Sequence, residues 1–416
     1  MPYHGTRAIT EGEPMEQRVR VAFVDDEASV LTSLRRTMLA MLDEWEMAFF
    51  TNGPDLLRRL AEEPFDVVVA DQRMPGMDGS NLLDEVSRLY PGMMRVILSG
   101  HADNASIFRT VGPAHIYLPK PCDPAALAQA IKSRMTLRAL MGGSEMTTLL
   151  NSVSKLPSAP KLFLDLVAEL RSPRSSAATV ANIIKRDMAM TAELLKLTNS
   201  SYYSTSTTVS APLQAVRILG LEIVQTLVLQ LGIFHQFQGS EEMAKQIELL
   251  NGYSQALGDL AERVALAAGE PDSVAKAAHC AALLSAIGSL VLLSEKSDDY
   301  RAALETVGPD HPLHVAEAEK FGADHTLIGA YLLGLWGFSD SIIEAITFSH
   351  RPSNCVSCVN PVLTALHVAR AVGPPFPLLD KGKASPLPLD QTYLADTGRA
   401  GSASNWRRAA EETTEA

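Results

Sequence analysis

The sequence predicts a doubly wound α/β domain with a parallel sheet, followed by an all-α domain. Four short apolar runs indicate buried strands, because each is bounded by turn or helix-start residues; they are VRVAFV, VVVAD, RVILS and HIYLP. Helical patterns lie between these runs, which favours a parallel sheet with helices on both faces. After about residue 149 the apolar residues follow a helical period and no segment indicates a strand, so a helical bundle is expected.

Polar side chains stand where the four predicted strands end: Asp25 and Asp26, then Asp71, Ser99 and Lys120. Because ligands bind at the carboxyl ends of parallel strands, we expect these side chains to converge on one crevice. Neighbouring carboxylates make a hard-oxygen site suited to Mg²⁺. Asp71 beside such a metal is suited to act as a nucleophile that accepts a phosphoryl group. Lys120 and the Ser99 hydroxyl would bind the phosphoryl oxygens.

This part of the chain, from about residue 18 to 140, resembles the receiver domain of bacterial two-component response regulators. The resemblance implies a flavodoxin-like, five-stranded sheet. It implies that Asp71 is the phosphoacceptor and that Asp25 and Asp26 are the acidic pair that binds Mg²⁺. The backbone carbonyl of Arg73 would complete the metal ligands that the protein provides.

The same resemblance assigns the switch residues and one proline bond. Ser99 and Tyr117 occupy the positions of the switch hydroxyl and the switch aromatic residue, and both are expected to move inward on phosphorylation. The Lys120–Pro121 bond is typically cis in the family, at the modest cost that X–Pro bonds allow. Asp78 and Gly79 are interpreted as turn and helix-start residues without a chemical role.

Bulk properties favour a cytoplasmic signalling protein. The length of 416 residues suits two or three domains, and the net charge of −12 argues against a broad surface for nucleic acid. No apolar run reaches the ~18 residues that span a bilayer, and the N-terminus lacks the apolar core of a signal peptide. Four cysteines are too few for a disulfide framework. We therefore expect no direct contact with nucleic acid or membrane.

The predicted organisation has five parts. A helix from about Asp123 to Leu140 closes the receiver, and Gly142, Gly143 and Ser144 form a flexible joint. The end of the chain, from about Asp390, is small, polar and charged, and is expected to be disordered. The predicted parts are a flexible N-terminus (1–17), the receiver domain (18–122), the connecting helix and joint (123–148), the helical output domain (149–372) and a Pro-rich, polar tail (373–416).

The helical part resembles the HDOD family, a relative of the HD metal-dependent phosphohydrolases. The resembling segments include LPSAPKLFLDLVAEL, IIKRDMAMTAELLKLTNSSYY, LQAVRILGLEIVQTLVL, LLSAIGSLVL and HTLIGAYLLGLWGFSDSIIEAITFSHRP, and they follow the family's order over about residues 149–352. The resemblance implies an HD-like all-α fold. Asp187 and Asn199-Ser200 stand at typical family positions, and we interpret them as helix-end and packing residues.

The catalytic chemistry of the HD hydrolases is missing from this sequence. Those enzymes use a His-Asp pair in a helix to ligate a metal, and the matching positions here are Ser285 and Ala286. The other positions of the family's metal ligands fall at His325 and His350, near Tyr253 and near Arg370. The Gly-Tyr-Pro extension of the cyclic-di-GMP hydrolases is also absent. The sequence therefore predicts a binding or regulatory domain that is not an enzyme.

One cysteine pair and two histidines lie outside these motifs. Cys355 and Cys358 form a CxxC pair that favours ordinary reduced thiols, with a structural zinc site as the alternative. His311 and His314 lie in a Pro-containing segment and are expected at the surface.

These observations predict a phosphorylation-dependent response regulator. A cognate sensor histidine kinase would phosphorylate Asp71, and the helical domain would relay the signal through contact with a downstream signalling protein. A homodimer through the receiver is compatible with this scheme. Two alternatives remain open: a metal-dependent cyclic-di-GMP phosphodiesterase, and a nucleotide sensor without catalysis.

Overall fold

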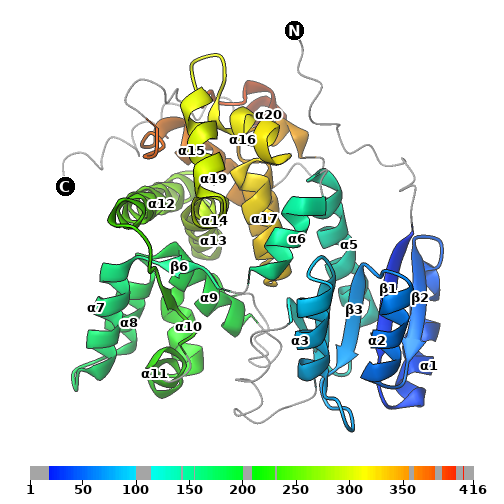
Figure 1. Cartoon of the computed structure of the whole chain (residues 1–416). Coiled ribbons are helices and arrows are strands. Elements are labelled where there is room, and N and C mark those ends of the chain that lie inside the picture. Colours follow the sequence, from blue (N-terminus) through cyan, green and yellow to red (C-terminus); the bar gives the residue numbers. More distant parts are fainter. Residues whose placement is uncertain are drawn as a thin grey trace.

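The structure is a computed structural model in which an α/β domain lies beside a larger helical region (Figure 1). It describes residues 18–99, 114–141, 144–153, 155–199, 209–229, 232–355, 360–379, 387–399 and 406. The predicted flexible N-terminus and the glycines of the predicted joint lie outside these ranges.

The first domain is built on a parallel sheet with the strand order β2-β1-β3-β4-β5. Its strands are β1 Val19–Val24, β2 Trp45–Phe50, β3 Val67–Asp71, β4 Met94–Ser99 and β5 Ile116–Pro119. Its helices are α1 Ala28–Thr37, the short η1 Leu39–Met41, α2 Gly53–Glu62, α3 Gly79–Leu89 and α5 Pro124–Leu140. Four of these strands coincide with the apolar runs of the sequence, whereas β2 at the sheet edge was not among them.

Alternate residues of the strands enter two separate cores, one on each face of the sheet. Val21 and Phe23 of β1 belong to one core, while Ala22 and Val24 belong to the other. Because successive side chains of a strand point to opposite faces, both faces must be covered by helices. The predicted doubly wound, parallel architecture is confirmed. From β1 the chain first adds β2 on one side and then adds β3, β4 and β5 on the other, so the switch point of the sheet lies between β1 and β3. Doubly wound sheets bind their ligands at such a point.

The rest of the described chain is mostly helical, as predicted. Its first helices are α6 Ser144–Ser152, α7 Pro160–Arg171, α8 Ala177–Ile184, α9 Met188–Thr198, α10 Pro212–Leu219, α11 Leu221–Leu229, α12 Glu241–Ala267 and α13 Asp272–Leu284. They are followed by α14 Ile287–Glu295, α15 Ser297–Thr306, α16 Leu313–Phe321, α17 His325–Leu335, α18 Asp340–Thr347, η3 Pro352–Asn354, α19 Pro361–Val372 and α20 Gln391–Asp396. Asp187 accepts a hydrogen bond from Met190 N at the start of α9, and Asn199 caps its end, which confirms their structural interpretation. Ser200 lies outside the described residues.

Two expectations for this region were wrong. A small parallel sheet joins β6 Pro157–Ser158 to β7 His235–Gln236, and strands of two residues are too short to show any period in a sequence. The segment after Asp390 was expected to be disordered, but Gln391–Asp396 form α20, while residues 400–405 and 407–416 lie outside the described residues. Tyr393 and Leu394 of this helix are buried, and the Tyr393 hydroxyl lies 2.8 Å from the hydroxyl of Thr364. Burial of these two side chains offsets the polar composition of the segment.

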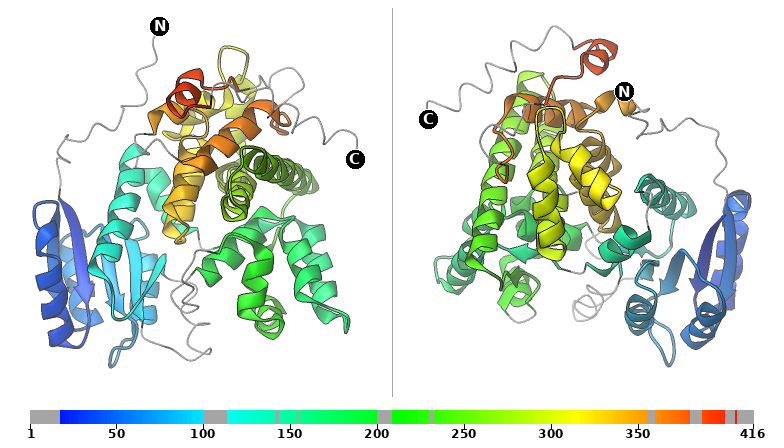
Figure 2. Two further views of the ribbon diagram at one scale, coloured as in Figure 1. Left: turned by 180° about the vertical axis from the view of Figure 1, so that it is seen from behind. Right: turned by 45° about the horizontal axis from the view of Figure 1, so that its top comes forward.

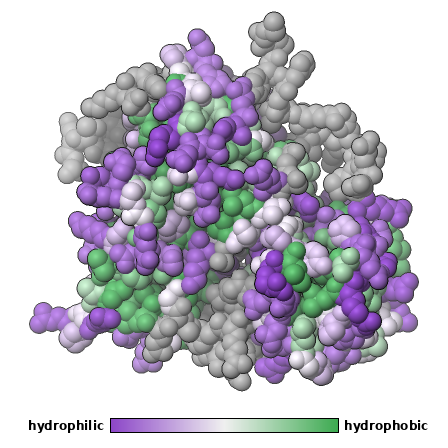
Figure 3. All heavy atoms as spheres, in the orientation of Figure 1, coloured by the Kyte–Doolittle hydropathy of each residue, from purple (hydrophilic) through white to green (hydrophobic). Residues whose placement is uncertain are grey.

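The apolar stretch Asp272–Glu295 covers α13 and α14. Within the described residues, this stretch of 24 residues is apolar enough to cross a membrane, and the bent pair α10–α11 would be a second if it were taken as one span. In the folded protein, 83% of the apolar part of this stretch is buried. On the face seen in Figure 3, the helical region presents mostly hydrophilic side chains. The stretch is therefore explained as a core element of the helical region.

The α/β domain contacts the helical region through α5, which lies beside α17 in both views of Figure 2. Arg134 on α5 is buried in this contact. Its Nε donates to the carbonyl of Gly334 at 2.8 Å and its guanidinium donates to the carbonyl of Phe338 at 3.4 Å. Asp340 lies 3.7 Å away and is half-exposed. A cation is thus buried between the domains, where it satisfies carbonyls at the end of α17.

A second contact runs from the sheet through α6 to α17. The backbone carbonyl of Asn151 on α6 accepts a hydrogen bond from Arg95 of β4 at 2.8 Å. The side chain of Asn151 donates to the carbonyl of Gly92 at 2.9 Å and accepts from the Tyr331 hydroxyl at 3.1 Å. Arg95, Asn151 and Tyr331 are all buried, so these hydrogen bonds tie the receiver sheet to the middle of α17.

Candidate functional site

Three carboxylates meet at the carboxyl edge of the sheet. Asp25 and Asp26 follow β1, Asp71 ends β3, and each offers one oxygen within 4.8 Å of the others. Asp25 and Asp71 are buried, while Asp26 is exposed to solvent. Hard carboxylate oxygens with one open side suit Mg²⁺, which keeps several waters. The donor set of this site therefore fits the metal that was predicted for it.

Lys120 connects the two buried carboxylates. Its Nζ lies 2.7 Å from Oδ2 of Asp25 and 2.5 Å from Oδ1 of Asp71. Burial alone would lower the pKa of Lys120, but the two carboxylates outweigh it and raise that pKa. Burial raises the pKa of Asp71, and its hydrogen bond with Lys120 opposes this effect. The site thus holds a fixed positive charge beside a partly desolvated carboxylate.

The loop after β3 holds Asp71 in place. The backbone N–H of Arg73 donates to Oδ2 of Asp71 at 3.1 Å. A Cβ atom on Gly79 would lie 2.1 Å from the carbonyl oxygen of Asp71, so the loop can close this tightly only around glycine. Asp78 caps α3 by accepting from Asn81 N at 2.8 Å, as expected for a helix-start residue. The proposed contact between the Arg73 carbonyl and a metal stays a prediction.

The remaining receiver positions are placed by the backbone. Ser99 ends β4 opposite Pro119 of β5, and Tyr117 pairs with Ile97. Their backbones therefore lie near the acidic edge, as the strand-end reasoning predicts. The side chains of Ser99 and Tyr117 lie outside the described part of the structure, so their switch roles stay predictions. The Lys120–Pro121 bond is cis, as expected.

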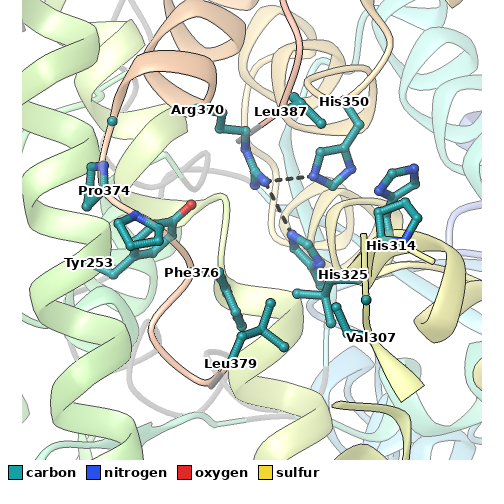
Figure 4. Close-up of a pocket in the computed structure, with 15 residues that line it drawn as sticks. Tyr253, Val307, His314, His325, His350, Arg370, Pro374, Phe376, Leu379 and Leu387 are labelled. Atoms are coloured by element: carbon teal, nitrogen blue, oxygen red, sulfur yellow. Dashed lines mark hydrogen bonds between the residues drawn. The ribbon is translucent and has the colours of Figure 1, made fainter. Parts of the chain in front are cut away.

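A second group of polar side chains surrounds a cavity of about 350 Å³ in the helical region (Figure 4). Its lining includes Tyr253, His325, His350 and Arg370, four positions that the sequence had matched to metal ligands of the HD hydrolases. Ser285 is buried nearby, but its hydroxyl donates to the carbonyl of Ala282 at 2.8 Å.

Ala286, the other half of the lost His-Asp pair, is the residue before α14. It offers no ligand atom. Among the described residues, the only group of three or more potential metal ligands is the acidic one in the receiver.

Arg370 lies beside the two imidazoles and contacts both, as Figure 4 shows. Its Nη1 is 2.8 Å from Nε2 of His350 and 3.4 Å from Nε2 of His325. Its Nη2 donates to the carbonyl of Ser285 at 3.3 Å. Since a guanidinium can only donate, both Nε2 atoms must be unprotonated acceptors, and each neutral ring then carries its proton on Nδ1.

Carboxylates stand behind both rings. Nδ1 of His325 lies 2.6 Å from Oε2 of Glu317, and Nδ1 of His350 lies 3.7 Å from Oδ2 of Asp324. Burial and the neighbouring Arg370 hold the pKa of His350 well below its usual value, which agrees with a neutral ring. Imidazoles oriented by carboxylates are typical of metal sites. Here the guanidinium, a permanent cation, occupies the place between them.

Sequence reasoning missed part of this cluster. His314 was expected at the surface, but it lines the cavity and stacks on His350 with ring centroids 4.7 Å apart. The segment that precedes α16 folds over the cavity, and nothing in its sequence indicates this. Glu317 was not singled out, although it is fully buried beside His325. Cys355 is buried and Cys358 lies outside the described residues, so the zinc alternative stays a prediction.

Comparison with known families identifies the two domains. Residues 21–132 match the response regulator receiver domain, and residues 156–352 match the HDOD domain. The fold and the acidic site thus define a response regulator receiver. The chain belongs to the response regulators that join an N-terminal receiver to a C-terminal HDOD domain.

Individual relatives match parts of the chain. The hydrogenase transcriptional regulatory protein HoxA of Cupriavidus necator is 28% identical over 183 residues, which are 41% of this chain and 37% of HoxA. The DNA-binding transcriptional regulator NtrC of Escherichia coli is 36% identical over 108 residues, 26% of this chain and 23% of NtrC. The chain therefore matches less than half the length of these relatives.

Solved structures are also similar in part. The MmoQ response regulator of Methylococcus capsulatus is 22% identical, and the match covers 61% of this chain and 98% of MmoQ with a TM-score of 0.44. The signal receiver domain of an HD domain-containing protein from Pseudomonas fluorescens is 28% identical, covering 30% of this chain and all of that domain with a TM-score of 0.27.

Proposed function

We propose that the protein is a phosphorylation-dependent response regulator whose HDOD domain, with an HD-like fold, relays the signal without catalysis. Asp71 accepts a phosphoryl group from a cognate sensor histidine kinase. Mg²⁺ would be held by Asp25, Asp26 and Asp71 with the carbonyl of Arg73, and would neutralise phosphoryl charge when bound. The observation that supports this most directly is the contact of Lys120 with both Asp25 and Asp71 beside the third carboxylate.

The residues have distinct chemical tasks in this proposal. An oxygen of Asp71 attacks the phosphorus, a P–O bond forms, and the P–N bond to the imidazole of the kinase breaks. Lys120 is placed to bind a phosphoryl oxygen, for which it must partly release the carboxylates that it now contacts. The Ser99 hydroxyl then binds a second oxygen, and Tyr117 follows it inward.

The path to the output domain begins at α5 and α6. A receiver with two conformations affects its neighbour only if their contacts differ between these conformations. Arg134 on α5 and Asn151 on α6 both contact α17, so a shift of the receiver would change the contacts of this helix. We propose that a downstream signalling protein responds to the change in the helical domain, in the cytoplasm and without nucleic acid or membrane.

A non-catalytic helical domain is supported by the chemistry of the cavity. Ala286 offers no ligand atom, the Ser285 hydroxyl is bonded to its own helix, and the charge of Arg370 would repel a metal ion placed between the imidazoles. We therefore favour a non-catalytic relay over the phosphodiesterase alternative.

The first prediction tests the phosphoacceptor. Incubation of the full chain with acetyl phosphate and Mg²⁺ should add one base-labile phosphoryl group, because Asp71 lies beside Lys120 and the predicted metal and is the carboxylate that we propose as the nucleophile. Intact mass and peptide mapping measure the product. The Asp71→Asn variant should remain unlabelled, while Asp55→Asn, an exposed carboxylate on α2, serves as the control and should label normally. Undiminished labelling of Asp71→Asn would refute the assignment.

A further inference from the structure

We infer that the cavity around Arg370 binds a small oxyanion, a phosphate or carboxylate that bears an aromatic group. This goes beyond the proposed function, which needs no ligand in the helical domain. The cavity lies between α12, α17, α19 and the segment after α19 (Figure 4). Its volume is at the lower end for ligand pockets, which suits a charged group joined to one ring.

The first reason is that Arg370 contacts no anion directly. Its hydrogen bonds go to two imidazoles and one carbonyl, and no carboxylate within the described ranges forms an ion pair with it. The carboxylates of Glu317 and Asp324 lie behind the rings of His325 and His350 and do not reach the guanidinium. An oxyanion in the cavity would therefore form the direct charged hydrogen bonds that this partly buried guanidinium lacks.

The second reason is a set of polar atoms without partners. Nε of Arg370 and Nε2 of His314 are buried and make no hydrogen bond to the described residues. Tyr253 also lines the cavity and faces Arg370 (Figure 4). These groups can donate hydrogen bonds to an oxyanion in the cavity.

The third reason is the opposite wall of the cavity. Phe376, Leu379 and Leu387 line it and give it an apolar surface. The ring of Phe376 is nearly parallel to that of His325 and meets Tyr253 edge-on, with centroids 5.9 and 5.5 Å apart. An aromatic group beside the oxyanion would pack against this wall.

The cavity is connected to the receiver by α17. His325 begins this helix at the cavity, and Tyr331 and Gly334 contact α6 and α5 further along it. A Cβ on Gly288 of α14 would lie 2.0 Å from the carbonyl oxygen of His325, so the backbones of α14 and α17 are in close contact at this end. Ligand in the cavity would thus act on the same helix that the receiver contacts.

Calorimetric titration of the full chain tests the inference with two probes, phenyl phosphate and benzoate. EDTA is present and Asp71→Asn is the parent protein, so that neither probe can bind through Mg²⁺ at the receiver. We expect one saturable site for at least one probe, with affinity for phenyl phosphate above that for inorganic phosphate. Arg370→Gln should lower the affinity at least about tenfold, the scale of a lost charged hydrogen bond.

Matched variants keep the test independent of misfolding. Arg370→Lys keeps the charge and should retain part of the binding, whereas Arg301→Gln removes a cation from the exposed face of α15 and should change nothing. Absence of saturable binding by both probes, or equal affinity in Arg370→Gln and its parent, would overturn the inference. Loss of binding in Arg301→Gln would also overturn it, because the effect would then be one of net charge.

Discussion

Arg370 illustrates how one side chain decides the chemistry of a pocket. Two imidazoles with carboxylates behind them are arranged as metal ligands usually are, but a guanidinium lies 2.8 and 3.4 Å from their Nε2 atoms. It supplies the positive charge that a metal would have supplied, without an open coordination position for water. The sequence indicated the loss of the His-Asp pair, while the contacts of Arg370 with the imidazoles required the fold.

The titration of His350 gives a prediction at this scale. Burial, Arg370 and His325 lower its pKa, and Asp324 opposes them, with the pKa ending well below 6.5 in the folded protein. Below pH 6.5 the unfolded chain binds a proton that the folded chain does not, so the free energy of unfolding falls as the pH falls, by at most about 1.4 kcal/mol per pH unit from this group.

Denaturant unfolding at pH 7, 6 and 5 checks this prediction. Other buried histidines have lowered pKa values, so the measured quantity is the difference between wild type and His350→Gln. The wild type should lose more stability than the variant between pH 7 and pH 5. An identical pH dependence in both proteins would show that His350 titrates normally in the folded state.

Residues of the receiver site could be identified from the sequence because the geometry of a parallel sheet is simple. Asp25, Asp71 and Lys120 follow different strands, and the carboxyl ends of those strands meet at one edge. His314 could not be identified in this way. Its position depends on how an irregular segment folds over the cavity, and the spacing of apolar residues in the sequence does not predict such a fold.

At the scale of elements, α5 and α17 form the contact on which the relay depends. Arg134→Gln should weaken it, because the carbonyls of Gly334 and Phe338 lose a buried charged donor, at a cost of about 1–3 kcal/mol. Amide exchange in α17 should become faster by roughly 5- to 150-fold, as this cost implies. Hydrogen-exchange mass spectrometry of residues 325–335 measures the effect.

Arg138→Gln is the matched control for this measurement. Arg138 lies one turn further along α5 but pairs with Asp66 of the receiver at 3.0 Å. Its removal should leave exchange in α17 unchanged. Equal acceleration by both variants would mean that α5 is merely less stable, and no acceleration by Arg134→Gln would mean that the contact does not protect α17.

The long helices could be predicted from the sequence, since their apolar periods are independent of their neighbours. The two-residue strands β6 and β7 could not, because they are too short to show a pattern. The six-residue edge strand β2 could not, because only Trp45 of WEMAFF is buried and the segment forms no continuous apolar run. α20 shows a different limit. Two buried side chains, Tyr393 and Leu394, order a segment whose composition predicts disorder, and their partners lie on α19 and elsewhere in the fold.

At the scale of the whole molecule, α17 spans the distance between the two functional regions. One end contacts the receiver through Arg134, and the other begins at His325 in the cavity. Coupling between sites is reciprocal, so a ligand that favours one conformation of α17 would also change the equilibrium of the receiver. The sequence predicted two domains joined by a connecting helix, but not that this helix packs against α17.

The central claim is that phosphorylation of Asp71 changes the contacts of α17. Beryllofluoride with Mg²⁺ mimics the phosphoryl group, and fluorine NMR verifies that it is bound. Hydrogen exchange of the full chain should then change in residues 124–152 and 325–335 of the wild type, and should remain unchanged in Asp71→Asn. Identical exchange profiles in both regions, with the mimic bound to the wild type, would contradict the account and would leave the receiver uncoupled from the helical domain.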